Sequence, residues 1–161
     1  MWDFSYTKGR EGGRIVEIEV KLEPAASGVR VEIHAPAVTP EVEALLERLS
    51  QADPETLLGF REGTAVPLTT ADILRFYGED KGVQAQTERG VYAVRQRLYE
   101  LEQRFAAQRF ARISHSEIVN LRKVTALDLT VTGTIRITLS DGTVCWASRR
   151  YVRRIKEVLG I

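Results

Sequence analysis

Cysteine is almost absent from this sequence of 161 residues, and the single Cys145 excludes several kinds of site. One cysteine forms no disulfide within the chain and supplies no thiolate cluster for a structural zinc ion. The two histidines, His34 and His115, lie in different segments without metal-ligand spacing. We therefore expect no bound metal. Cys145 lies between Val144 and Trp146 in an apolar segment, so we expect it in the hydrophobic core.

Long hydrophobic runs are missing as well. No stretch approaches 18 consecutive apolar residues, and residues 1–6 lack the basic and apolar regions of a secretion signal. Because the chain also lacks cysteine pairs, it is expected to be a cytoplasmic protein with no membrane span. The length fits one domain, or one domain with a small appendage.

The sequence also lacks the two glycine-rich loops that most often hold nucleotide phosphates, Gly-x-Gly-x-x-Gly and Gly-x4-Gly-Lys-Ser/Thr. Ser114 and Ser116 flank His115, but neighbours on an extended chain point to opposite faces, which disfavours a nucleophile and base pair. A hydrolase built around His115 has no acid–base partner at a usable spacing. We therefore expect no cofactor, no catalytic residue and no enzymatic activity.

Charge is nearly balanced overall but unevenly distributed. Residues 1–60 hold 6 basic and 11 acidic side chains, whereas residues 61–161 hold 17 basic and 11 acidic ones. From Arg104 onward there are 11 basic side chains against 4 acidic ones, and most of the basic ones are arginine. Arginine suits phosphate groups and guanine edges, which favours a nucleic acid or another anionic partner. On charge alone, a solvated basic surface is an equally good interpretation.

The first part of the chain, residues 1–54, is predicted to form a small β-β-α unit. Residues 14–22 and 29–34 alternate apolar and polar side chains, and the turn residues between them predict a hairpin. Residues 40–51 have apolar side chains at helical spacing and begin with a proline after a capping threonine, which predicts a helix. Residues 1–13 show neither the strand period nor the helix period of apolar side chains, so they are expected to be a tail.

The rest of the chain, residues 55–161, is predicted to be mostly strand with two short helices. Glycine, threonine and an Asp-Gly pair separate segments of alternating polarity. Ser148 is a suitable N-cap for the last helix. The overall fold class is therefore α+β. The expected strands are residues 56–61, 64–68, 72–78, 83–87, 91–94, 110–113, 117–121, 126–131, 134–139 and 144–147, and the expected helices are residues 96–107 and 149–159.

Several motifs in this second part resemble the LytTR family of DNA-binding domains. The most specific is the block of residues 110–124, which runs from Phe110-Ala111-Arg112 to Arg122-Lys123-Val124. The other motifs, at a similar spacing, are residues 71–77, residues 133–143 and residues 147–152, which include Ser148-Arg149-Arg150-Tyr151. The likeness covers about residues 55–161. It implies a bacterial transcriptional regulator whose all-β domain inserts loops into successive major grooves of double-stranded DNA. The best-known members carry a phosphorylation-receiver domain before it, whereas residues 1–54 resemble the short first unit of stand-alone members.

The resemblance also implies which side chains read the DNA. The first reading loop falls at Lys81-Gly82-Val83, where Val83 replaces the polar reader of some relatives and only Lys81 brings charge. The second places His115 at a reading position, and the third falls on Arg150. The side chains expected at the DNA are Lys81, Ser114, His115, Ser116, Arg122, Lys123, Arg149, Arg150 and Arg153. The alternatives are a capped surface turn around His115 and a solvated helix face on which the arginines pair with Glu157.

Two functions are therefore compared. The preferred one is sequence-specific binding of double-stranded DNA by a transcriptional regulator, and a homodimer is expected because such domains usually bind repeated half-sites. The stripe of Val42, Leu45 and Leu49 either supplies the dimer contact or packs within one chain. The alternative is a protein-interaction or ligand-sensing module that has lost DNA binding, which Val83 and the near-neutral charge keep open. Basic tips along one edge would favour DNA, and a deep pocket would favour a ligand.

Overall fold

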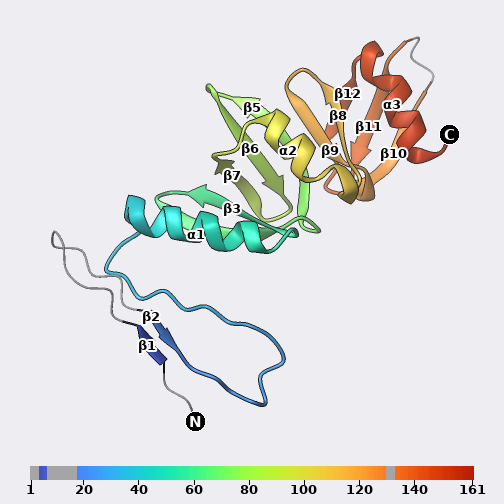
Figure 1. Cartoon of the computed structure of the whole chain (residues 1–161). Coiled ribbons are helices and arrows are strands. Elements are labelled where there is room, and N and C mark those ends of the chain that lie inside the picture. The colour runs from blue at the N-terminus through green and yellow to red at the C-terminus, as the bar shows by residue number, and fades with distance from the viewer. Residues whose placement is uncertain (1–3, 7–17, 130–132) are drawn as a thin grey trace. The chain divides into compact units, whose positions relative to one another are not determined.

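The structure, a computed structural model, describes residues 4–6, 18–129 and 133–161, which belong to two compact units (Figure 1). The first unit, Met1–His34, holds a two-stranded antiparallel sheet of β1 (Phe4–Tyr6) and β2 (Ile18–Val20). The second unit, Ala35–Ile161, holds all the other described helices and strands. Among the described residues, no helix combines the length and the apolar character needed to cross a membrane.

The predicted hairpin of residues 14–22 and 29–34 is wrong. Residues 14–17 lie outside the described residues, and β2 pairs with β1, which comes from the segment expected to be a tail. Residues 29–34 form no strand, and Val29 is 98% exposed. Alternation indicates that a segment suits a strand, but its partner is chosen by the cross-strand contacts that the rest of the chain offers.

The first helix, α1 (Pro40–Ala52), belongs to the second unit. Thr39 caps it as predicted, since its hydroxyl oxygen accepts a hydrogen bond from the backbone N–H of Val42 at 3.4 Å. At the other end of the helix, Arg104 donates to the carbonyl of Ser50 at 3.1 Å. The division between the units therefore comes after His34, whereas a separate role for residues 1–54 stays a prediction.

A seven-stranded antiparallel sheet forms the middle of the second unit, in the order β4-β3-β7-β6-β5-β9-β8. Each of these strands lies within one residue of its predicted bounds, because alternating polarity and the turn residues between the strands mark them locally. The strands are β3 (Thr56–Arg61), β4 (Thr64–Thr69), β5 (Ile73–Glu79), β6 (Gly82–Thr87), β7 (Gly90–Val94), β8 (Phe110–Ser114) and β9 (Glu117–Asn120).

One side of this sheet is covered by α2 (Leu98–Arg104), which is followed by the 3₁₀ turn η1 (Ala106–Gln108). The predicted helix over 96–107 is thus shorter, and its end tightens into a 3₁₀ turn before Arg109, whose φ is 59°. The rings of Phe76, Phe105 and Phe110 pack together with centroids 5.5–5.9 Å apart. This aromatic cluster holds α2 and η1 on the sheet.

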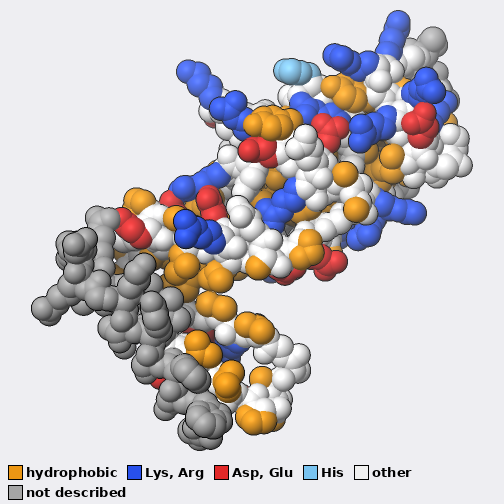
Figure 2. Space-filling view, viewed as in Figure 1, with side chains coloured by type: hydrophobic (Ala, Val, Ile, Leu, Met, Phe, Trp, Pro, Cys, Tyr) orange, Lys and Arg blue, Asp and Glu red, His pale blue; other side chains and the backbone are white. Residues whose placement is uncertain are grey.

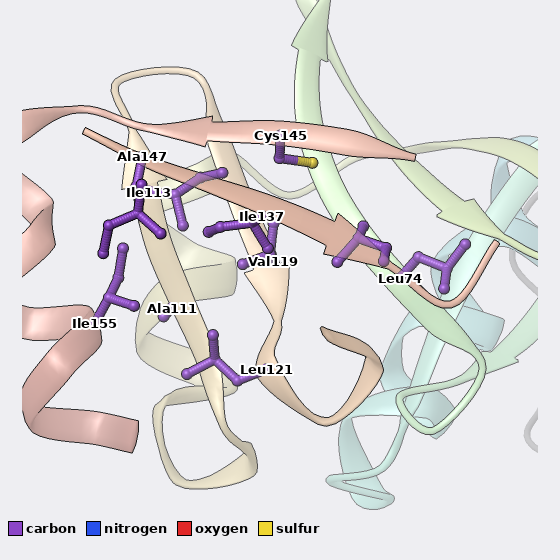
Figure 3. Close-up of a cluster of buried hydrophobic side chains, with 11 residues drawn as sticks. Leu74, Ala111, Ile113, Val119, Leu121, Ile137, Cys145, Ala147 and Ile155 are labelled. Atoms are coloured by element: carbon purple, nitrogen blue, oxygen red, sulfur yellow. The ribbon is translucent and has the colours of Figure 1, made fainter. Parts of the chain in front are cut away.

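A second, three-stranded sheet consists of β10 (Val124–Asp128), β11 (Ile135–Leu139) and β12 (Val144–Ala147), and α3 (Arg149–Leu159) follows it. β10 begins and ends earlier than predicted, and residues 130 and 131 of the expected strand lie outside the described residues. Figure 3 shows Ile155 of α3 turned towards Ile137 of β11 and Ile113 of β8. Cys145 is 2% exposed, which confirms its predicted place in the core.

Candidate functional site

Two hairpin turns of the large sheet lie side by side at one end of β5. The turn between β5 and β6 carries Lys81, and the turn between β8 and β9 carries His115. β5 pairs with β6 on one side and with β9 on the other, and the backbone N–H of Gly78 donates to the carbonyl of Ser116 at 2.9 Å. Neighbouring strands lie about 4.8 Å apart, so Lys81 and His115 come to the same edge of the sheet.

The start of α3 reaches the same edge. The backbone N–H of Ser148 donates to the carbonyl of Ile113 at 2.8 Å, two residues before His115. Ser148 occupies the predicted N-cap position, but its hydroxyl lies 3.4 Å from the same carbonyl and makes no cap hydrogen bond. Arg149 and Arg150 come next in the chain. The two hairpin turns and the start of α3, which we call the three tips, therefore lie at the upper edge of the second unit in Figure 1.

We call this edge the rim. Figure 2 shows Lys and Arg side chains spread along it, with a histidine between them. The rim consists of six of the predicted site residues, which come from three separate tips. They are Lys81, Ser114, His115, Ser116, Arg149 and Arg150.

The two rim arginines on α3 are exposed. Gly133 leaves room for one of them, because a Cβ at that position would lie 2.6 Å from Nε of Arg149. The guanidinium of Arg150 lies 5.5 Å from the ring centre of Tyr151. Arg153, one turn further on, pairs with Glu157 at 3.0 Å, which is the alternative described above for a solvated helix face. Arg149 and Arg150 are therefore better placed than Arg153 to meet an anionic partner.

The tip between β5 and β6 carries a net negative charge. Glu79, Asp80 and Lys81 are all exposed there, so one cation stands beside two carboxylates. Asp80 and Lys81 both have positive φ, 48° and 64°, which is the backbone of a tight two-residue hairpin turn. Residues other than glycine adopt this backbone at a cost of about 1–2 kcal/mol each, so the charges are displayed on a strained turn.

The tip between β8 and β9 is held by a semi-buried ion pair. Arg75 of β5 binds Glu117 at 2.6 Å and donates through Nε to the side-chain oxygen of Gln86 at 2.7 Å. Burial alone lowers the pKa of Arg75, but the hydrogen bond and charge of Glu117 outweigh it and leave the pKa above its usual value. Gln86 in turn donates to Asp141 at 2.8 Å. This network joins the two sheets of the second unit beneath the rim.

Cys145 borders this network without taking part in its chemistry. Its sulfur lies 3.8 Å from a terminal nitrogen of Arg75. Burial and the nearby carboxylate of Glu117 raise the pKa of the Cys145 thiol to about 12, so the thiol stays protonated. Elsewhere in the described part of the chain, no three His, Cys, Asp or Glu side chains lie close enough to share a metal ion.

Sequence reasoning missed two arginines that support the rim. Arg75 and Arg112 each stand between two apolar residues of a strand. Arg75 binds the side chain of Glu117, which follows the turn, and Arg112 binds the carbonyls of the turn itself. Arg112 donates through Nε to the carbonyl of Ser114 at 3.0 Å and through a terminal nitrogen to the carbonyl of His115. A charged residue between buried neighbours was the signal that could have identified both.

Arg122 and Lys123 lie away from the rim. They belong to the 3₁₀ turn η2 (Leu121–Lys123), which follows β9 at the end opposite Glu117. At about 3.3 Å per residue, the length of β9 separates them from the rim by roughly 10 Å or more. Asn120 begins this turn: its oxygen accepts from the N–H of Arg122 at 3.1 Å, and its nitrogen donates to Ile73 at 2.8 Å. Asn120 therefore satisfies backbone groups on two neighbouring segments.

An open groove with a volume of about 620 Å³ runs along α3. It is lined by both polar and apolar side chains and does not enclose a small molecule. The lining residues are Arg149, Val152, Arg153, Lys156, Glu157, Gly160 and Ile161. Its basic members continue from the rim down one side of the helix, which suits an extended anionic partner better than an enclosed ligand.

Known proteins agree with this architecture. The family model described as LytTr DNA-binding domain matches residues 63–160. An uncharacterized HTH-type transcriptional regulator of Staphylococcus aureus strain NCTC 8325 is 36% identical over 132 residues, which cover 81% of this chain and 89% of that protein. Its counterpart in strain MRSA252 is 35% identical over the same length. A solved LytTr DNA-binding domain from Bacillus cereus superposes with a TM-score of 0.64 at 19% identity, covering 66% of this chain and 98% of that one.

The relatives are named as helix-turn-helix proteins, but strands separate the three α-helices that the structure describes. Five strands lie between α1 and α2, and five more lie between α2 and α3. Within the ranges 18–129 and 133–161, no two α-helices follow one another through a turn. The fold of the second unit is thus mostly β with a few helices, as predicted, and any contact made by the rim comes from hairpin turns and one helix start.

Proposed function

Because the chain belongs to the family of LytTr DNA-binding domains, we propose that it binds double-stranded DNA through the rim and acts as a transcriptional regulator. The observation that carries this proposal is the meeting of three tips, with Lys81, His115 and Arg150, at one edge of the second unit. Each of these side chains comes from a different hairpin or helix, so a rigid scaffold presents them together.

The dimensions of the rim suit a major groove. The four strands β6, β5, β9 and β8 are neighbours, and at about 4.8 Å per interval their edge spans roughly 14 Å. The major groove of B-DNA is about 12 Å wide. The whole edge is thus slightly wider than one groove, so one hairpin turn at a time has the size to enter a groove, while the flanking side chains meet the phosphates on either side.

The rim residues divide into base readers and phosphate binders. Arg150 presents a fork of donors that matches the O6 and N7 atoms of guanine, and the imidazole of His115 presents donors and acceptors to a base edge. Arg149 and the hydroxyl of Ser116 are the phosphate binders and contact the DNA backbone. The Ser114 hydroxyl accepts from the N–H of Ser116 at 3.2 Å and keeps its own proton for a phosphate oxygen.

A gel-shift titration on a duplex selected from a random library, with a scrambled duplex as control, tests the proposal. Arg150→Ala should cost about 1–3 kcal/mol on the selected duplex and flatten the preference at one base pair. Arg89→Ala is the matched control, because Arg89 is exposed at the turn between β6 and β7, at the opposite end of β6 from Lys81. Equal losses on both duplexes for Arg150→Ala would remove its reading role.

The salt dependence of binding tells how far the contact extends beyond the rim. If Lys81 and Arg149 each neutralise one phosphate, the slope of log K against log salt should be about −1.8. If the DNA also reaches Arg122 and Lys123 at the far end of β9, the slope should be about −3.6. A slope near zero would contradict phosphate binding altogether.

Two copies of the chain on adjacent half-sites complete the proposal, since a single rim covers only a short stretch of DNA. In α1, Leu45 and Leu49 are each 37% exposed, so part of the predicted stripe is available for a second copy. Light scattering at micromolar concentration, with and without the selected duplex, measures this directly. A monomeric mass in both samples would remove the homodimer.

A further inference from the structure

Arg112 is placed to control the tip that carries His115. The residue lies in β8 between the buried Ala111 and Ile113, and its own side chain is only 12% exposed. Its guanidinium reaches forward along the chain and donates to two successive carbonyls, those of Ser114 and His115. The planar fork of arginine binds both carbonyl oxygens at once, which a single hydrogen bond does not achieve.

The strand is irregular at this point. The register of β8 against β9 shifts between Arg112, which faces Ile118, and Ser114, which faces Glu117. Such a shift changes the direction in which the following side chains point, and it leaves backbone groups without a ladder partner. The guanidinium supplies the missing donors, so the orientation of His115 depends on Arg112.

The guanidinium of Arg112 also contacts α2 on its other side. Its remaining terminal nitrogen lies 3.4 Å from Glu102 of α2, and the same carboxylate lies 3.8 Å from Arg154 of α3. We call the two hydrogen bonds from Arg112 to the carbonyls of Ser114 and His115 the clamp. Glu102 therefore connects the clamp with α3, the helix that carries Arg150. With its donors used in this way and little exposed surface, Arg112 is unsuited to bind a phosphate.

We propose that Arg112 is a positioning residue that sets the base preference of the His115 tip without touching DNA. This inference rests on the proposed DNA binding. Loss of the clamp allows the His115 tip to adopt several orientations, so the preference for one base falls. The phosphate contacts of Arg149 and Lys81 stay in place, so the affinity for DNA of unrelated sequence changes little.

Arg112→Gln removes the fork, and Arg89→Gln removes the same charge from the far turn of the sheet as a control. We expect Arg112→Gln to weaken binding to the selected duplex about tenfold and to the scrambled duplex no more than the control does. Arg112→Lys keeps the charge but loses the planar fork, so it should recover only part of the preference. An equal loss of affinity on both duplexes for Arg112→Gln, matching Arg89→Gln, would overturn the inference.

Hydrogen exchange of the free protein separates failure of this inference from failure of the proposed function. The backbone amides of residues 114–117 should exchange at least several-fold faster in Arg112→Gln than in the wild type and in Arg89→Gln. If the wild type binds both duplexes alike, the proposed base reading fails, and unchanged exchange would then also refute the clamp. Should Arg112→Gln not fold, Glu102→Gln keeps the donors of Arg112 but loosens its guanidinium, so it should still lower the preference about threefold. A preference unaltered in that variant would count against the proposal.

Discussion

The two hairpin tips at the rim are held in different ways. Between β5 and β6, the two-residue turn of Asp80 and Lys81 takes its shape from its own backbone, with positive φ at both residues. Between β8 and β9, the turn around His115 is fixed by side chains outside the turn, the distant Arg75 through Glu117 and the nearby Arg112 through two carbonyls. The first tip is thus a local structure, whereas the second exists only once the sheets and helices have packed.

The two hairpin tips also differ in charge. The first tip exposes two carboxylates beside its lysine, whereas the one carboxylate next to the second tip, Glu117, is neutralised by Arg75. The tip with the less repulsive charge is therefore also the tip with the more elaborate support. This comparison assigns base reading mainly to His115 and Arg150, and leaves Lys81 a minor part.

The largest expected effect is on the stability of the second tip. Glu117→Gln removes the negative charge that pairs with Arg75 and leaves a largely buried cation with neutral partners alone, which should lower the free energy of unfolding by about 2 kcal/mol. Glu79→Gln makes the same change on the first tip, where the carboxylate is exposed, and should change the stability by less than about 0.5 kcal/mol. Urea denaturation of both variants checks this, and equal stabilities would contradict the comparison.

DNA binding should show the next largest difference. His115→Ala should weaken binding to the selected duplex by about 1–2 kcal/mol and leave the scrambled duplex nearly unaffected, because a base contact is lost. Lys81→Ala should cost about 0.5 kcal/mol or less on both duplexes, since its neighbours already offset its charge. Titration of both variants on both duplexes gives the four affinities. A larger loss for Lys81→Ala would reverse the assignment of the tips.

The same contrast explains what the sequence could predict. The strands of the large sheet were predictable because alternation and turn residues act locally, and the resemblance placed Lys81, His115 and Arg150 in three loops that meet at the rim. The pairing of Arg75 with Glu117 was not predictable, because the two residues are 42 positions apart and meet only through the pairing of β5 with β9. Pairing between distant segments also decided against the hairpin expected for residues 29–34.

A smaller effect tests whether the positive φ of Lys81 in the first tip lowers the stability of the protein. Lys81→Gly should raise the free energy of unfolding by about 0.5–1 kcal/mol, because glycine adopts positive φ without a steric cost. The same variant should bind DNA slightly less well, since the lysine is lost. Thermal denaturation and the gel shift measure the two effects. A loss of stability would indicate that the side chain of Lys81 makes a contact that offsets the strain.

The smallest expected effect is a gain in affinity for DNA. Asp80→Asn removes one carboxylate from the first tip, and asparagine accepts positive φ as readily as aspartate does. The net charge of the tip rises from −1 to zero, so binding to selected and scrambled DNA alike should strengthen about twofold at low salt. The gain should disappear at high salt, because an exposed charge is then screened. A gain restricted to the selected duplex would instead mean that Asp80 faces a base, and the first tip would then read sequence as the second one does.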